Sequence, residues 1–289
     1  MRFPLVIRWT FPVFLLLSWS ASAQVIERVS VSSEGVQGNG VSRLGGGHWQ
    51  VSDDGRYVVF ESEASNLVDD DANGLKDVFV RDLELRTTAR VSVDVNGGDA
   101  DNSSARPAIS GDGRYVAFES GATDLIAGGT GGVGDVFVRD LLTGQTTRIT
   151  VALAGGEPDG PSGRSSISGD GRYVTFVSAA GNLVSGDTNG IADIFVRDRQ
   201  AGTTERVSVN SLGGDANAAT WVSAIVAFHP RDETSSASAP STTICWSGSA
   251  VVVPSSSEPI IWVDAMASVS PGNRNSCSPG QTAITCVGL

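Results

Sequence analysis

Ser52-Asp53-Asp54-Gly55-Arg56-Tyr57-Val58-Val59-Phe60 is the first copy of a stretch that recurs twice more, at intervals of 58 residues. The later copies begin at Ser110 and Ser168, and all three keep the pattern Ser-x-Asp-Gly-Arg-Tyr-Val-x-Phe. A second motif, Asp-(Val/Ile)-Phe-Val-Arg-Asp, begins at Asp77 and recurs with the same period. Two separate anchors at one spacing predict three tandem units of one supersecondary structure.

Each unit predicts four short β-strands, which in the second unit lie at about 106–109, 114–119, 135–140 and 146–151. These segments are rich in Val, Ile, Phe, Tyr and Thr and are bounded by Gly, Asp and Ser. Because the strands are apolar on both faces, a unit must stack against copies of itself. The sequence therefore predicts an all-β fold, a β-propeller of four-stranded antiparallel blades. A β-solenoid is the alternative, although its repeats are usually much shorter.

The two motifs together resemble the TolB-type (WD-like) β-propeller repeat of exported bacterial proteins. The resemblance covers residues 48–209. It implies a propeller used mainly for binding other macromolecules. It does not imply an activity, because one fold hosts many functions.

The two ends of the repeat array depart from the pattern. Glu27-Arg28-Val29-Ser30-Val31 resembles a fourth strand without its blade, and we expect it to complete the last blade and close the ring. Ala224-Ile225 begins a fourth unit in register, but the Ser-x-Asp-Gly-Arg-Tyr turn is missing, and residues 259–264 echo a third strand. Two interpretations of this region stay open, a decayed fourth blade and a fault in the reading frame or gene end. A closed ring needs about four or more blades.

Residues 1–23 have the layout of a secretory signal peptide, with Arg2 and Arg8 ahead of a short apolar run and Ala21-Ser22-Ala23 at the end. This divides the chain into a signal peptide (1–23), the propeller repeats (24–228) and a divergent C-terminal segment (229–289). We expect a periplasmic or secreted protein without membrane insertion, because no later stretch is long and apolar enough to span a bilayer. The cysteines, whose pairing the sequence leaves open, all lie in the last segment: Cys245, Cys277 and Cys286.

The chain is acidic, with a formal net charge of −12, and loss of the two leader arginines makes it more negative. Such a protein repels nucleic-acid phosphates and anionic lipid head groups. We therefore expect a protein or polysaccharide partner and no nucleic acid.

One loop carries a candidate calcium site. Residues 69–77 read D-x-D-x-N-G-x-x-D, which places oxygen ligands as in the front of an EF-hand loop, although Val80 stands where the bidentate Glu belongs. The third repeat keeps part of the pattern, and the second repeat has lost it. The alternative is an Asx-rich turn in which Asp77 fixes the start of the strand. The predicted ligands are Asp69, Asp71, Asn73, Asp77, Asp187, Asn189 and Asp193.

The acidic groups that recur in every unit, such as Asp54 and the Arg81-Asp82 pair, are predicted to be structural, since a catalytic centre is normally unique. The sequence contains no G-x-S-x-G elbow, no H-E-x-x-H and no phosphate loop. The favoured hypothesis is a non-catalytic exported binding or scaffold propeller, stabilised by calcium. The alternatives are a propeller hydrolase or lyase acting on a polysaccharide or peptide, and a truncated fragment of a longer propeller.

Overall fold

The computed structural model describes residues 26–45, 49–210, 213–215, 225–226 and 262–263. The predicted leader lies outside the described residues, as do the three cysteines and all of the divergent C-terminal segment except Trp262–Val263. The predicted division of the chain into three parts therefore stays a prediction.

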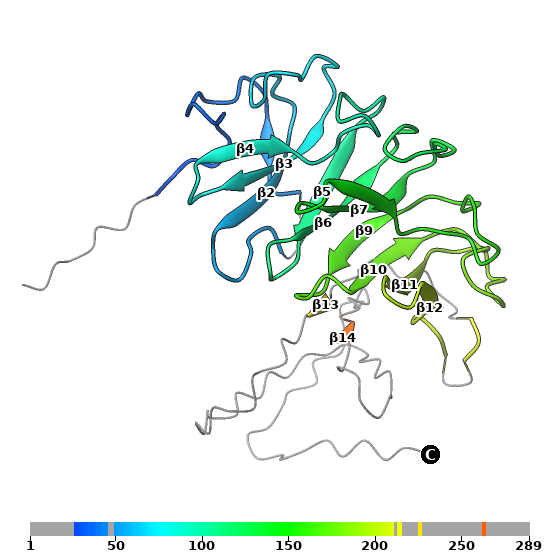
Figure 1. Cartoon of the computed structure of the whole chain (residues 1–289). Coiled ribbons are helices and arrows are strands. Elements are labelled where there is room, and N and C mark those ends of the chain that lie inside the picture. The colour runs from blue at the N-terminus through cyan, green and yellow to red at the C-terminus, as the bar shows by residue number, and fades with distance from the viewer. Residues whose placement is uncertain (1–25, 46–48, 211–212, 216–224, 227–261, 264–289) are drawn as a thin grey trace, which may run out of the picture.

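The described chain forms three four-stranded antiparallel sheets, drawn one after another in Figure 1. The first sheet consists of β1 (Ser42–Arg43), β2 (Tyr57–Ser62), β3 (Asp77–Asp82) and β4 (Thr87–Arg90). The second consists of β5 (Ser104–Ile109), β6 (Tyr115–Ser120), β7 (Asp135–Asp140) and β8 (Gln145–Arg148). The third consists of β9 (Ser162–Ile167), β10 (Tyr173–Ser178), β11 (Asp193–Asp198) and β12 (Thr203–Arg206).

Each sheet is a meander in which every strand pairs with the next one along the chain. This confirms the predicted units of four antiparallel strands. The fourth strand of the second unit ends earlier than the predicted 146–151. The strand ends at Arg148; beyond it, the Ile149 N–H still donates to the Val136 carbonyl at 2.8 Å, and the Thr150 hydroxyl donates to the Asp135 carboxylate at 2.6 Å.

The Ser-x-Asp-Gly turn explains why the first motif recurs. The Ser52 hydroxyl donates to Asp54 and accepts the Tyr57 N–H, while Gly55 adopts a φ of 72°, which favours glycine. Asp54 also accepts the Arg56 N–H, and the same contacts hold the other two turns. Asp54 and its copies are therefore turn residues, as predicted.

The arginine and the last aspartate of the motifs fasten β2 to β3. Arg56 donates to the Asp82 carboxylate at 2.7 Å and lies over the Tyr57 ring, 4.9 Å from its centroid. The second and third sheets repeat both contacts through Arg114 and Arg172. These side chains stabilise the sheet in all three units, so the structural role predicted for Asp82 is confirmed.

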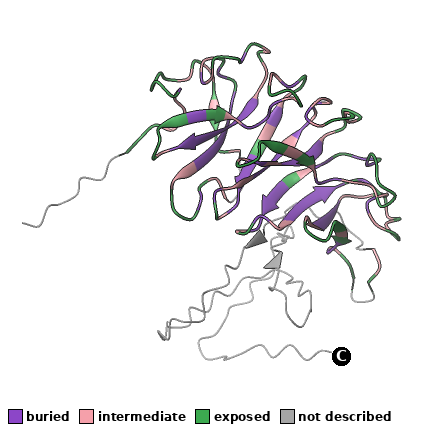
Figure 2. Ribbon diagram, viewed as in Figure 1, coloured by how far each residue is buried: buried purple, intermediate pink, exposed green. Residues whose placement is uncertain are grey.

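The sheets pack face to face as blades. One face of the first sheet, with Val59, Val78 and Val80, lies in the same buried cluster as Phe118 and Phe137 of the second sheet. The second and third sheets share an equivalent cluster. The central strands are accordingly buried in Figure 2. In every sheet a pair of stacked phenylalanines forms the packing face, with ring centroids 5.6–5.9 Å apart.

The N-terminal segment packs on the free face of the first blade. Val29 contacts the cluster of Phe60 and Phe79, and Val31 forms a bridge to Gln37. The ring is not closed in the part of the chain that the structure describes, and the expected closing role of residues 27–31 stays a prediction, because most of the last blade lies outside the described residues. This segment also binds Thr88 of the first blade, whose hydroxyl donates to the Val31 carbonyl.

The start of the fourth unit differs from the other three. β13 (Ile225–Val226) pairs antiparallel with β14 (Trp262–Val263). In a complete blade the first strand pairs with the second, whereas the third strand pairs with the second and fourth. Trp262 and Val263 thus pair with the start of the fourth unit, and the assignment of residues 259–264 as a third strand stays a prediction.

Candidate functional site

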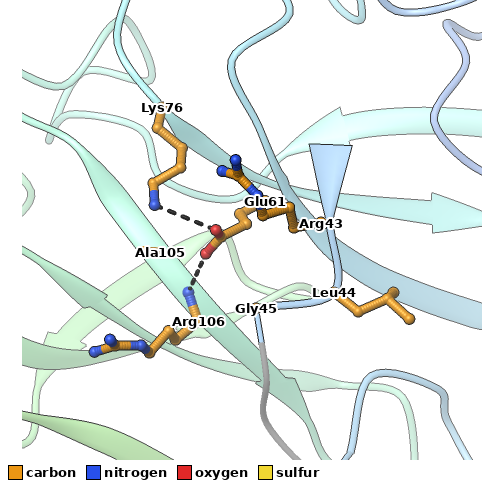
Figure 3. A pocket seen from close by; sticks show the side chains of 7 residues that line it. All are labelled: Arg43, Leu44, Gly45, Glu61, Lys76, Ala105 and Arg106. Carbon is orange, nitrogen blue, oxygen red and sulfur yellow. Dashed lines mark hydrogen bonds and ion pairs between the residues drawn. The ribbon is translucent and has the colours of Figure 1, made fainter. Parts of the chain in front are cut away.

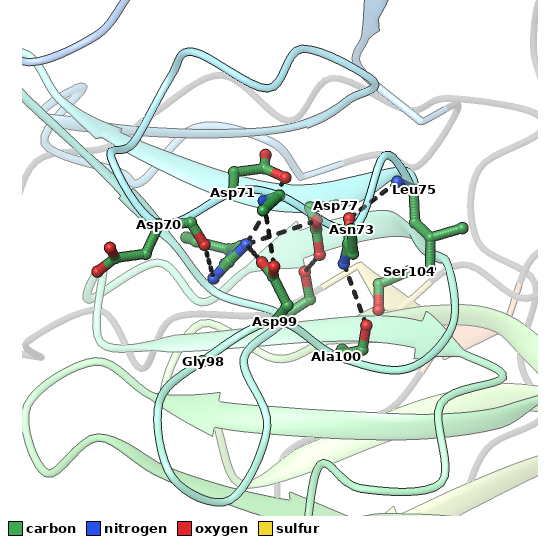
Figure 4. A network of polar contacts seen from close by, with 12 residues as sticks. Asp70, Asp71, Asn73, Leu75, Asp77, Gly98, Asp99, Ala100 and Ser104 are labelled. Carbon is green, nitrogen blue, oxygen red and sulfur yellow. Dashed lines mark hydrogen bonds and ion pairs between the residues drawn. The ribbon is translucent and has the colours of Figure 1, made fainter.

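The loop with the predicted calcium ligands connects β2 to β3. Asp71 and Asp77, both labelled in Figure 4, lie beside the guanidinium of Arg90, which comes from the end of β4. Asp71 and Asp77 are buried, whereas Asp69 is exposed. The structure thus brings two of the predicted carboxylates together and leaves Asp69 at the surface.

Asn73 shapes this loop. Its Oδ1 accepts the Leu75 N–H at 2.8 Å, and its Nδ2 donates to the Ala100 carbonyl at 3.1 Å. The first contact is an Asx turn, so the predicted Asx-rich turn is present. Asp77 fixes the start of β3 as well, because it accepts the Ser92 hydroxyl at 2.6 Å, and that hydroxyl accepts the Val78 N–H.

Arg90 is the centre of the polar network. Its Nη1 lies 3.8 Å from Asp71 Oδ1 and 3.9 Å from Asp77 Oδ2, and it donates to Asp99. Its Nη2 donates to the Asp70 carbonyl at 2.8 Å. The Arg90 side chain is only 4% exposed, so its charge acts where water screens it weakly. The guanidinium therefore supplies positive charge to all three carboxylates.

Burial raises the pKa of two acids in this network, Asp77 and Asp71. It raises the pKa of Asp77 to about 6, while the Ser92 hydrogen bond and the Arg90 charge oppose the rise. Burial also raises the pKa of Asp71. Asp71 Oδ1 and Asp77 Oδ2 accept no hydrogen bond from the described residues. These two oxygens therefore depend on a neighbouring cation for their stabilisation.

The third repeat builds the same arrangement. Arg206 Nη1 lies 3.0 Å from Asp187 and 3.4 Å from Asp193, and it also contacts Asp215. Asn189 accepts the Ile191 N–H and donates to Asp193 at 3.1 Å. Burial raises the pKa of Asp187. All three ligands predicted in this repeat thus gather beside one buried arginine.

The second repeat keeps only part of the network. Arg148 Nη1 lies 3.9 Å from Asp135 and contacts Glu157, but Gly129 stands at the position of Asp71. Glu157 compensates by accepting the Gly131 N–H at 3.1 Å. Three groups therefore recur in every blade: a strand-end arginine, the aspartate that begins the third strand, and an acid nine residues after the arginine.

We call this recurring group the arginine joint. Its acid lies in the linker to the next blade, and Asp99 also accepts the Ala72 N–H of the β2–β3 loop at 3.1 Å. The joint therefore fastens that loop to the linker. Its members are Arg90, Asp77 and Asp99 in the first blade, Arg148, Asp135 and Glu157 in the second, and Arg206, Asp193 and Asp215 in the third.

Arg90 occupies part of the space beside the predicted calcium ligands Asp71 and Asp77. Calcium requires six to eight oxygen ligands at about 2.3–2.6 Å. Within the described residues, no group of three or more His, Cys, Asp or Glu side chains is arranged to hold a metal ion. Calcium binding at Asp71 and Asp77 stays a prediction, and the ion would have to share these carboxylates with Arg90.

Sequence reasoning missed Arg90 and Asp99 as members of this site. A signal was present, because Arg90, Arg148 and Arg206 stand at the same position of the repeat and an acid follows each at the same distance. A buried arginine in every copy indicates a buried acid to pair with it.

Comparison with solved structures shows similarity to β-propeller proteins. TolB from Acinetobacter baumannii is 21% identical, with a TM-score of 0.36 over 62% of this chain and 34% of that one. A TolB-like protein of Agrobacterium tumefaciens is 17% identical, with a TM-score of 0.37 over 56% and 50%. The β-propeller domain of the trilobed protease from Pyrococcus furiosus is 16% identical, with a TM-score of 0.33 over 52% and 38%.

The likeness to these proteins concerns the fold alone, and the chain spans between about a third and half of their lengths. The sequence matches no protein-family model and no curated protein. In the part of the chain that the structure describes, no helix has the length and apolar character needed to cross a bilayer.

Proposed function

We propose that this chain is a non-catalytic binding or scaffold propeller that acts in the periplasm or outside the cell and binds a protein or polysaccharide. The observation that carries the proposal is the use of the recurring polar residues. Asp54, Asp77, Asp82 and their copies hold turns, strand starts and strand pairs together. These acids are therefore occupied by the fold in each blade.

The residues that differ between blades support a binding role. The repeat places Lys76 before β3 in the first blade, where the second blade has Gly134. Arg43 likewise stands where the second blade has Ala105, since Ser42 pairs with Ser62 as Ser104 pairs with Ser120. Side chains that the fold does not require in every copy are free to serve recognition.

Calcium stabilisation belongs to the same proposal. Asp71 Oδ1 and Asp77 Oδ2 are buried and accept no hydrogen bond from the described part of the chain, which supports a role for a further cation near them. Calcium would lower the pKa of both acids and tie the β2–β3 loop to the linker.

An activity screen tests the non-catalytic assignment. The purified chain is incubated with panels of polysaccharides and peptides, and new reducing ends, unsaturated sugars and cleaved peptides are measured. We expect retention of some panel members without turnover. Turnover that is lost on substitution of a polar residue absent from the other repeats would show that the chain is an enzyme.

A further inference from the structure

An open pocket of about 610 Å³ lies between the first two blades. Residues from the first strand of each blade, from β2 and from the loop before β3 line it, as Figure 3 shows. The lining residues are Arg43, Leu44, Gly45, Glu61, Lys76, Ala105 and Arg106.

Four charged residues line this pocket, the cations Arg43, Lys76 and Arg106 and the carboxylate Glu61. Glu61 is 5% exposed, and it accepts the Lys76 ammonium at 3.2 Å and the Arg106 backbone N–H at 2.9 Å. The side chains of Arg43 and Arg106 are 59% and 51% exposed. The lining thus carries three cations and one acid in a protein whose formal net charge is −12, and two of the cations are at least half exposed.

The exposed arginines have weak partners of their own. Arg43 lies 3.6 Å from Glu63, and both side chains are at least half exposed. Arg106 Nη1 lies 2.8 Å from Glu119, in a pair that is also open to water on the arginine side. Exposed ion pairs contribute little to stability, so an incoming carboxylate can exchange with them at small cost.

The backbone of Arg106 is strained in a way that directs its side chain. Arg106 has a φ of 50°, in the left-handed region that non-glycine residues avoid, and the register of β5 shifts between Ala105 and Ala108. Bulges of this kind re-aim a side chain, and strained residues concentrate at functional sites. Glu61 holds the strained conformation through the Arg106 N–H. The third blade repeats the bulge at Arg164, but the two added cations are found only at the first position.

Lys76 gives the pocket a unique member, because it is the only lysine in the 289 residues. The second blade has lost both added cations, with Gly134 at the position of Lys76 and Ala105 at that of Arg43. The positive pocket is thus a property of the first blade pair and not of the repeat.

We propose that this pocket binds acidic side chains of a peptide partner. Guanidinium groups bind carboxylates in a planar, bidentate geometry, and Lys76 adds a point charge. Leu44 is 53% exposed beside the cations, so it offers apolar contact to the residue next to an acid. None of the seven lining residues is aromatic, which disfavours an acidic sugar, because no ring is present for its face to stack on. This inference rests on the proposed binding function and names the partner's chemistry.

The test measures fluorescence anisotropy of a rhodamine-labelled hexaglutamate peptide with the full chain at low salt. The double variant Arg43→Ala/Lys76→Gly introduces the residues that the second blade has at these two positions. Arg28→Gln/Arg86→Gly removes two exposed charges elsewhere and is the charge-matched control. We expect the pocket variant to bind about tenfold more weakly than the parent and the control, as loss of two exposed ion pairs predicts.

Equal binding by the two double variants, or no binding by the parent, would overturn the proposed site. Pocket-dependent binding of a hexagalacturonate in place of hexaglutamate would overturn the peptide assignment. Cleavage of the probe, detected by mass spectrometry, would instead contradict the non-catalytic function.

Chemical labelling keeps the proposal testable if the double variant does not fold. Lys76 carries the only side-chain amine, so its acetylation is read directly by mass spectrometry of the parent. Hexaglutamate should slow the acetylation of Lys76, and hexaglutamine should not. No protection by hexaglutamate would overturn the site.

Discussion

Substitution of Arg90 by methionine should destabilise the first blade more than the equivalent change destabilises the second. Arg90→Met leaves Asp71 and Asp77, whose side chains are 2% and 1% exposed, without their buried positive charge. Removal of one partner of a buried ion pair costs about 3–5 kcal/mol. That is a large part of the roughly 5–15 kcal/mol that stabilises a typical domain.

Arg148→Met is the matched control. Arg148 is 10% exposed, Glu157 is 47% exposed, and only Asp135 is deeply buried beside them. We therefore expect a smaller loss, about 1.5–3 kcal/mol, as for a lost hydrogen bond to a charged group. Urea unfolding followed by far-ultraviolet circular dichroism gives the free energy of unfolding of both variants and of the parent.

The pH dependence gives this prediction its sharpest form. Burial raises the pKa of Asp77 to about 6, above its value of 3.8 in the unfolded chain, so its negative charge destabilises the folded state at neutral pH. Loss of Arg90 should raise that pKa further. The deficit of Arg90→Met should then be largest at pH 8 and should shrink as the pH falls toward 5, because the folded state takes up the proton.

Two results would refute this reasoning about the arginine joint. One is a deficit of Arg90→Met that is the same at pH 5 and pH 8, which would mean that buried carboxylate charge is not its cause. The other is an equal loss for Arg90→Met and Arg148→Met, which would mean that the additional Asp71 has no effect.

Three further predictions concern the loops and the core. Arg86 has a φ of 57° where the other blades have Gly144 and Gly202, each with a φ of 70°. Because this conformation strains a residue with a side chain, Arg86→Gly should raise the free energy of unfolding in urea by about 0.5–1 kcal/mol. A loss of stability would contradict the strain argument. Calcium should raise the melting temperature and a chelator should lower it, and Asp71→Ala should abolish the difference. If the parent protein melts at the same temperature with calcium and with chelator, the calcium hypothesis is wrong. Phe118→Ala should cost about 3–5 kcal/mol, since Phe118 is fully buried and stacks on Phe137; a loss below 1 kcal/mol would speak against the shared core of the first two blades.

The sequence predicts most of the blade because its residues act locally. Gly55 and Asp54 make the turn, Tyr57 and Phe60 begin and fill the strand, and the 58-residue period transfers this to all three units. The early end of the fourth strand at Arg148 was not predicted, because the residues after it are as rich in Ile, Thr and Val as the strand itself.

The sites are less visible in the sequence than the blade. The loop at residues 69–77 suggests a cation site, but the position of Arg90 within it depends on how β4 ends against β3. The pocket is harder still to predict. Arg43, Lys76 and Arg106 are far apart in the chain, and they meet only because two blades pack and a bulge reorients Arg106.

Amide hydrogen exchange tests the central claim, that each 58-residue unit is one blade packed on the next. The slowest-exchanging amides should fall in three equivalent blocks on the buried third strands, at Asp77–Asp82, Asp135–Asp140 and Asp193–Asp198. The loops that connect the strands, including the β2–β3 loop, should exchange faster in every unit, whereas the equally buried second strands should be protected as well. Protection that does not repeat at intervals of 58 residues would contradict the blade structure.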